Sequence, residues 1–386
     1  MKLKKSLLAA SVFAALSFSA SAQESNEPKL TVKPTGLLLL DAAAYGGNTH
    51  GLFKGGAGVP DVRIGVSAEY GKWKARIDVG YAYGKVGLKD IYMQYTFNER
   101  NFVRGGSFIY QYGLQSAYSS AMKSTMEEPT SNELFAPPRL LGVMYEHSGD
   151  KFLAAASAHL EPSSIILTPS QMGHQGYGLL ARLAWRPLHE DGKVAQIGIS
   201  GAFTSPYVNS DDYGNKHHTI ELAGNFPTRV ERVKALDVTV DHAMNSFKFT
   251  PELLLSSRRV ALESQYFYTR VNRRLGLPGY TAYGAYGILR GLILGKGYSY
   301  DMLNGGLAAP APRTLEAALE YNYTSLVDRK AGFFGGRVSG VSCTFNYYIN
   351  KYMIARLRYG FTKRWDLPGT PDMDLSTIQA RLQIAF

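Results

Sequence analysis

Apolar and polar side chains alternate over the last eleven residues of this chain. One face of an extended strand there would carry Ile378, Ala380, Leu382, Ile384 and Phe386, and the other face Thr377, Gln379, Arg381 and Gln383. The same alternation recurs in residues 73–83, 315–323, 341–349 and 353–361. Segments of about ten residues with one apolar face have the length and pattern of tilted membrane-spanning strands.

Composition favours strands over helices. The chain has 40 Gly, 26 Tyr and 18 Phe with only 19% charged residues, and aromatic residues favour strands while glycine favours turns. After residue 22, no run of 18 or more consecutive apolar residues suggests a membrane-spanning helix. We therefore predict an all-β fold, a transmembrane antiparallel β-barrel.

The N-terminal segment is typical of a secretory signal peptide. Lys2, Lys4 and Lys5 precede an apolar run over residues 7–18 and the small-residue triplet at 20–22. Cleavage after Ala22 would leave residues 23–386, which we expect to form a single barrel domain. That product has 39 basic and 31 acidic residues, a net charge of +8. Because we expect an exported protein of the bacterial outer membrane, we exclude nucleic acid as its partner.

Sixteen segments fit the alternating pattern. They are residues 35–44, 62–70, 73–83, 86–97, 101–110, 139–147, 151–160, 177–186, 193–203, 246–255, 259–269, 281–294, 314–326, 337–349, 352–362 and 376–386. We assign a further candidate, residues 235–240, to a loop because bacterial barrels have an even number of strands. Eighteen strands remain an alternative.

Connections between these segments alternate between short and long along much of the chain. We expect tight turns at 71–72, 149–150 and 350–351, and long loops at 45–61, 111–138, 161–176, 204–245 and 363–375. Residues 295–313 are an exception, because a long segment falls on the end that should carry short turns.

Inward-facing charges decide what passes a barrel wide enough to hold water. Alternation places ten cations and seven carboxylates on inward faces: Arg63, Lys74, Arg76, Arg182, Arg186, Lys248, Arg259, Arg356, Arg358 and Arg381 against Glu69, Asp78, Asp90, Glu252, Glu263, Glu316 and Glu320. As pore-lining residues of an anion path we select Lys74, Arg76, Arg182, Arg356, Arg358 and Arg381. The last three would form a basic ladder on adjacent strands. The alternative for each arginine is a wall residue paired with a carboxylate on the neighbouring strand.

No motif suggests catalysis, a metal or a cofactor. The densest polar cluster, Asp211 and Asp212 with His217 and His218, reads better as a solvated surface loop than as a metal or catalytic site. The single cysteine, Cys343, excludes an intramolecular disulfide framework.

Four segments resemble the phosphate-selective porin O/P family: Phe102 to Phe108, Gly178 to Pro187, Leu315 to Tyr323 and Phe345 to Asn350. The resemblance implies a homotrimer of sixteen-stranded barrels with a pore-constricting third loop, to which we assign Lys123 and Arg139. A terminal strand ending in Phe386 also resembles the signal that the outer-membrane assembly machinery reads.

We therefore expect an outer-membrane porin, not an enzyme, that passes small hydrophilic solutes by passive diffusion and prefers anions. Residues 111–138 contain Glu127, Glu128 and Glu133 beside Lys123, so general anion passage is expected more than phosphate specificity. The alternatives are a barrel with a narrow or plugged lumen, acting as a surface adhesin or as an enzyme with its site at the rim, and a soluble exported β-sandwich.

Overall fold

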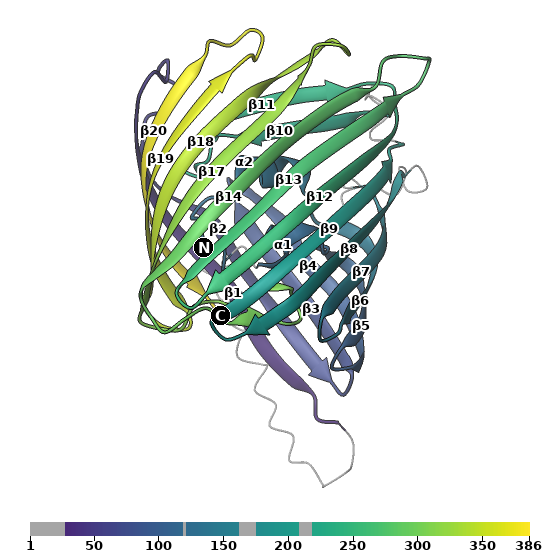
Figure 1. Ribbon diagram of the computed structural model, residues 1–386, viewed down its shortest axis with the longest axis vertical. Helices are drawn as coiled ribbons and strands as arrows, with labels where there is room; N and C mark the ends of the chain where they lie inside the picture. Colours follow the sequence, from purple (N-terminus) through teal and green to yellow (C-terminus); the bar gives the residue numbers. More distant parts are fainter. Residues whose placement is uncertain (1–27, 119–120, 162–174, 208–217) are drawn as a thin grey trace, which may run out of the picture.

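The computed structural model describes residues 28–118, 121–161, 175–207 and 218–386. Within these residues, sixteen antiparallel strands close into one barrel (Figure 1). Each strand pairs with the next barrel strand along the chain, and β20 closes the barrel by pairing with β1, from Leu37 opposite Ala385 to Gly46 opposite Ser376. The predicted signal peptide lies outside the described residues, as do Asp211, Asp212 and His217.

The barrel strands match all sixteen predicted segments, some with longer ends. They are β1 (Thr31–Gly46), β2 (Gly56–Tyr70), β3 (Trp73–Ala82), β4 (Lys85–Asn98), β5 (Asn101–Phe108), β6 (Leu140–Ser148), β7 (Phe152–Leu160), β8 (Tyr177–Glu190), β9 (Lys193–Ser205), β12 (Ala243–Ser257), β13 (Val260–Arg273), β14 (Tyr280–Leu294), β17 (Thr314–Asp328), β18 (Phe333–Tyr348), β19 (Met353–Trp365) and β20 (Met373–Ala385). The prediction of sixteen strands is confirmed.

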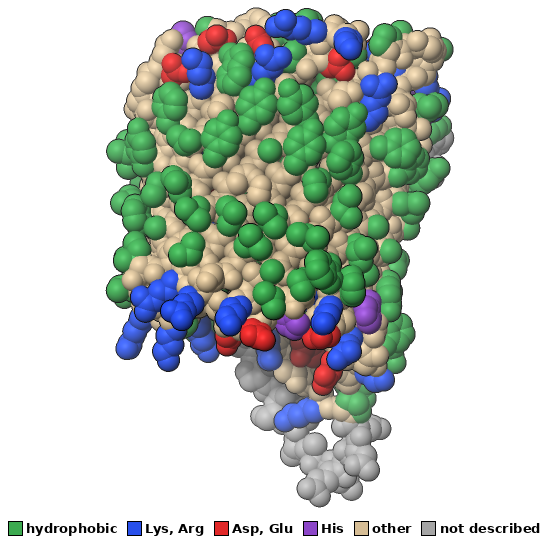
Figure 2. All heavy atoms as spheres, in the orientation of Figure 1, with side chains coloured by type: hydrophobic (Ala, Val, Ile, Leu, Met, Phe, Trp, Pro, Cys, Tyr) green, Lys and Arg blue, Asp and Glu red, His purple; other side chains and the backbone are tan. Residues whose placement is uncertain are grey.

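Alternation decides which side chains face outward. On β3, Ile77 is 57% exposed while its neighbour Asp78 is 2% exposed, and on β20 the same contrast separates Ile378 from Gln379. Figure 2 shows the result on one face, where apolar side chains cover the barrel wall between two edges of charged residues. Such a belt matches a hydrocarbon layer. In the part of the chain that is described, no helix is both long and apolar enough to span a membrane.

The two ends of the barrel differ in the length of their connections. One end, called here the short-turn end, carries the turns at 71–72, 99–100, 191–192 and 258–259. The opposite end, the long-loop end, carries the segment 109–139 with α1 (Gly113–Ala117) and α2 (Thr130–Phe135). Alternation placed Arg259 on an inward strand face, and this prediction is wrong. β12 ends at Ser257 and the chain turns there, which leaves Arg259 exposed.

Two small sheets are not part of the barrel ladder. One pairs β10 (Ile220–Asn225) with β11 (Lys234–Val240), so the segment assigned to a loop from the parity of the strand count forms a hairpin outside the barrel ladder. The other pairs β15 (Tyr300–Asp301) with β16 (Gly306–Leu307) inside the exceptional long connection at the short-turn end.

Candidate functional site: the channel interior

The third loop, defined as the described residues 109–118 and 121–139, folds into the barrel and packs against one side of the wall. The backbone N–H groups of Gly113 and Leu114 donate to Ser200 Oγ and Gln265 Oε1, both at 3.0 Å. On α2, the N–H of Ser131 donates to Asn322 Oδ1 at 2.9 Å. These acceptors belong to β9, β13 and β17, so the loop covers the wall formed by the later strands.

Two of the predicted pore-lining arginines, Arg356 and Arg381, hold this loop in place, and a third, Arg358, binds the connection between β10 and β11. Arg356 donates to the carbonyl oxygens of Lys123 and Ala121, at 2.6 and 3.0 Å. Arg358 donates to the carbonyl oxygen of Pro227 at 3.2 Å. All three arginines face inward, as alternation predicted, but Arg356, Arg358 and Arg381 are buried. Their guanidinium groups bind loop backbone and buried carboxylates, so they do not form an exposed basic ladder along the channel.

Arg381 has the densest set of partners among the three. It contacts Asp41 through two hydrogen bonds of 2.7 and 2.6 Å, Glu127 at 2.8 Å and the carbonyl oxygen of Met126 at 2.6 Å. A guanidinium group with two carboxylates and a carbonyl is a strongly satisfied buried charge. Because Glu127 belongs to the third loop and Asp41 to β1, this one side chain ties the loop to the barrel seam.

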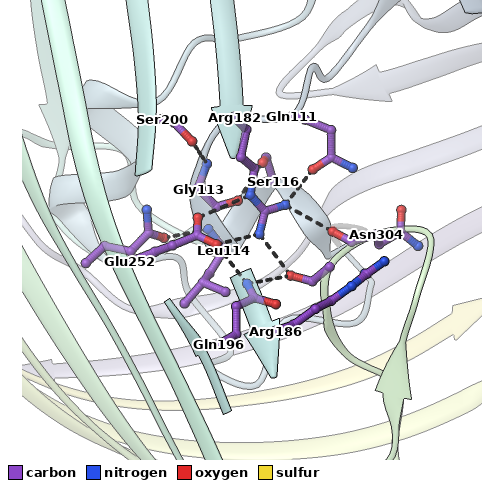
Figure 3. Close-up of polar contacts among 12 residues, drawn as sticks. Gln111, Gly113, Leu114, Ser116, Arg182, Arg186, Gln196, Ser200, Glu252 and Asn304 are labelled. Carbon is purple, nitrogen blue, oxygen red and sulfur yellow. Dashed lines mark hydrogen bonds and ion pairs between the residues drawn. The ribbon is translucent and has the colours of Figure 1, made fainter. Parts of the chain in front are cut away.

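Arg182, another predicted pore-lining residue, is also buried, and it joins two inserted segments (Figure 3). It pairs with Glu252 at 2.8 Å and donates to Gln111 Oε1 of the third loop at 2.6 Å. From the other side it donates to the carbonyl oxygens of Asn304 and Gly305, at 3.0 and 2.9 Å. The expectation that Arg182 lines an open anion path is therefore replaced by a clamp between the third loop and the segment 295–313.

The fold of the segment 295–313 explains why a long connection occurs at the short-turn end. Its β15–β16 hairpin turns into the barrel opening, where Gln196 Nε2 donates to the Gly305 carbonyl at 3.1 Å. Arg186 donates to the carbonyl oxygen of Met302 at 2.7 Å, and the N–H of Leu307 donates to Tyr118 Oη at 3.2 Å. The hairpin thus meets the third loop inside the barrel and narrows the short-turn end.

Open space remains beside the third loop. One cavity of about 500 Å³ reaches residues of the short-turn end, including Lys351 and Tyr352. A second, of about 710 Å³, reaches residues of the long-loop end, including Pro206 and Glu221. The two cavities share five lining residues, which define a neck between them: Arg63, Ile109, Ser116, Tyr118 and Arg139.

Positive charge dominates the lining of the first cavity. Its lining cations are Arg63, Arg76, Arg104, Arg139 and Lys351, and its lining carboxylates are Asp78 and Asp90. Several of these are paired: Arg76 with Asp78 at 2.7 Å, and Arg139 with Asp90 at 2.9 Å. Asp61 binds Arg63 at 2.5 Å without lining the cavity itself. When Asp61 is counted with Asp78 and Asp90, the five cations exceed the three carboxylates by two positive charges.

The remaining predicted residues take different positions. Arg76 and Arg139 line the first cavity, and Arg139 also lines the neck. Lys123 lines the second cavity and pairs with Glu128 at 2.5 Å. Burial would raise the pKa of Glu128, but contact with Lys123 and Asn132 holds it below its ordinary value. Lys74 pairs with Glu69 at 2.9 Å in a half-exposed ion pair close to the turn at 71–72.

Sequence reasoning missed several cations of the interior, among them Arg104, Lys89 and the buried Arg290. Arg104 alternates with the outward Val103 and Gly105 on β5, so the period-2 pattern could have found it. Its guanidinium carbon lies 4.5 Å from the ring centre of Tyr92. Lys89 could not be found this way, because a register shift sets both Lys89 and Asp90 opposite Asp78. Such a β-bulge breaks the local alternation, and Lys89 and Asp90 each line a cavity.

A closed barrel of sixteen antiparallel strands, with an apolar outer belt and polar cavities inside, is the architecture of a bacterial outer-membrane porin. The chain matches the family described as phosphate-selective porin O and P over residues 40–386, and it belongs to that family. No curated protein matches the sequence significantly.

Solved structures with the same fold include a porin, an outer membrane channel and a trimeric outer membrane protein. The anion-selective porin from Comamonas acidovorans aligns with a TM-score of 0.59 at 12% identity, over 93% of this chain and 100% of that one. The trimer form of OmpT from Vibrio cholerae aligns at 0.55 and 12%, over 92% and 99%. The outer membrane channel DcaP of Acinetobacter baumannii aligns at 0.55 and 12%, over 92% and 97%. At these low sequence identities, the structural similarity shows that the fold is shared and no more.

Proposed function

We propose that this porin lets small anions diffuse across the outer membrane through the two cavities and the neck between them. The observation that carries the proposal is the cationic excess around the first cavity, with Arg63 and Arg139 at the neck. Fixed positive charge at a narrow point of a water-filled path lowers the entry barrier for anions and raises it for cations. The presence of open cavities favours a channel over a plugged adhesin or rim enzyme.

The pairing of the arginines argues for a general anion preference. Arg63, Arg76 and Arg139 each hold a carboxylate, so only part of their charge is available to a solute. A dedicated phosphate site would present free guanidinium forks for bidentate contact. We infer that phosphate is one of several anions that pass.

Planar-bilayer recording with the purified protein tests this function. Under a salt gradient, we expect ion-conducting steps and a reversal potential whose sign indicates anion selectivity. This anion preference should weaken as the salt concentration rises, because mobile ions screen the fixed charges. Chloride, acetate and phosphate salts would rank the anions. A barrel that folds, as judged by heat-modifiable gel migration, but conducts no ions would contradict the proposal.

We propose further that the chain is exported, cleaved after Ala22, recognised by the assembly machinery through Phe386, and assembled as a homotrimer. The N-terminal pattern supports the cleavage, and the trimer form of the outer membrane protein OmpT from Vibrio cholerae supports the oligomer. Intact mass of the purified protein would locate the cleavage, and native mass spectrometry would count the subunits. A monomer in mild detergent would contradict the trimer.

The inserted hairpin leads to a prediction about channel width. The ends of the hairpin lie together, since the N–H of Ala308 donates to the Ser299 carbonyl at 2.9 Å, so Gly-Gly can replace residues 300–307. We expect a larger single-channel conductance, because the segment would no longer fill part of the opening. Leu303→Ala is the control: Leu303 is an exposed residue of the same hairpin and lines neither the first nor the second cavity. Equal conductance in the shortened and parent proteins would show that the hairpin does not narrow the path.

A further inference from the structure

A shallow groove of about 340 Å³ runs along the outer wall where β13, β14, β17 and β18 meet. It exists because small residues lie side by side: Gly291 is the register partner of Ala317, and Cys343 is the partner of Leu319 on the next strand pair. A Cβ atom added at Gly291 would meet nothing within 4 Å. The side chains of Leu289, Ile293 and Leu319 line the groove beside these small residues.

The groove ends at a basic edge. Arg259 lines it at the short-turn end, where the Arg259 carbonyl accepts a hydrogen bond from the Leu292 N–H at 2.8 Å. Four more cations occupy the neighbouring turns of the same barrel end. The basic edge comprises Arg258, Arg259, Lys296, Arg313 and Lys351, and all five are exposed. In Figure 2, basic side chains gather along this edge, below the apolar wall.

The basic edge is uncompensated on the protein. None of its five side chains makes an ion pair with any described residue. Other turns at this end of the barrel contain carboxylates beside their cations, as Glu99 does beside Arg100 and Asp150 beside Lys151. Positive charge is therefore concentrated below the groove and is not a general property of the short-turn end.

Chemistry and position together define an occupant. The short turns of bacterial barrels face the periplasm, so the basic edge lies at the headgroup level of the inner leaflet and the groove at the level of its acyl chains. Basic side chains at such a level attract anionic headgroups. A narrow apolar groove accommodates a hydrocarbon chain without leaving polar groups unpaired. One molecule that satisfies both features is an anionic glycerophospholipid.

We propose that the groove and the basic edge form a binding site for one anionic phospholipid of the periplasmic leaflet. Its phosphate lies among Arg259, Lys296 and their basic neighbours, and one acyl chain lies over Gly291, Ala317 and Cys343. A second copy of this chain is a less suitable occupant, because it would have to bury five cations and supply carboxylates to them. The groove lies on the outer wall, and of the basic edge only Lys351 also lines the first cavity, so the proposal does not depend on what the pore conducts.

Native mass spectrometry of the purified, detergent-solubilised protein tests the site. With equal amounts of phosphatidylglycerol and phosphatidylcholine, we expect the wild type to retain the anionic lipid about tenfold more, the order expected from several cations near one headgroup. The double variant Arg259→Glu with Lys296→Glu should lose this preference. Gly291→Trp should lower retention of phosphatidylglycerol about tenfold by filling the groove. Gly201→Trp, on the outer face of β9, is the matched control, since its Cβ would come no closer than 3.9 Å to another atom.

Gel migration before and after heating checks that each variant folds. If Gly291→Trp does not fold, the double charge variant still tests whether the site prefers the anionic lipid. Equal retention of the two lipids by the wild type would mean nonspecific adsorption and would overturn the proposal. Cys343, the single cysteine, reports on the competing occupant. A Cys343 to Cys343 crosslink on mild oxidation would place a second copy over the groove and would also overturn it, whereas slower maleimide labelling with phosphatidylglycerol alone supports it.

Discussion

Replacing Arg381 with methionine is expected to lower the free energy of unfolding by about 3–5 kcal/mol, the range for breaking one side of a buried ion pair. The reason is that Asp41 and Glu127 would remain buried without their shared cation. The loss of the hydrogen bond to the Met126 carbonyl would also release the third loop from the barrel seam. Urea unfolding followed by tryptophan fluorescence in detergent measures the first effect. Single-channel recording measures the second, as a larger and noisier conductance.

The control for this variant is Lys363→Met. Lys363 and Asp374 form an exposed pair 4.0 Å apart between β19 and β20, the strand that carries Arg381. Exposed pairs contribute at most about 1 kcal/mol, so the control should unfold nearly as the wild type does. Adding Asp41→Asn and Glu127→Gln to Arg381→Met should recover part of the lost stability, because neutral amides would replace the two buried carboxylates. Equal stability of the Arg381 and Lys363 variants would contradict the anchoring role.

Reversing the charge at the neck should produce the largest change in selectivity. Arg139→Glu changes the local charge by two units beside Asp90, at a point that both cavities share. In water, two unit charges about 4 Å apart interact by about 1 kcal/mol, so this change amounts to about 2 kcal/mol for an ion in contact. We expect the anion-to-cation permeability ratio to fall by about thirtyfold at low salt, since about 1.4 kcal/mol corresponds to a factor of ten, and by less at high salt.

Reversal potentials under a potassium chloride gradient measure this ratio. Arg270→Glu is the control: Arg270 is an exposed side chain of β13 that donates to Thr281 and lines neither cavity. It carries the same change in charge without reaching the path. If the Arg139→Glu and Arg270→Glu variants give the same reversal potential, the neck does not select ions and the cationic excess inside the barrel has another role.

Local pattern was enough to predict the strands and their faces. A membrane strand must alternate because lipid lies on one side and water or packed polar groups lie on the other, and this requirement is visible within ten residues. It identified all sixteen barrel strands, including β20, and it assigned Asp78, Arg356 and Arg381 to the inward face. It failed at Lys89, where a bulge adds one residue to β4, and at Arg259, which lies in the turn before β13 begins at Val260.

The sequence by itself therefore determined that this chain forms a sixteen-stranded barrel, and which side chains turn toward its interior. Only the tertiary structure decided which of those inward cations meet open space. Arg381 and Glu127 are separated by 254 positions, and Arg182 and Gly305 by 123. Contacts of that range depend on where the third loop and the 295–313 hairpin fold inside the barrel. No alternation along a strand encodes that placement, so Arg139 remains at the open neck while Arg356 is covered.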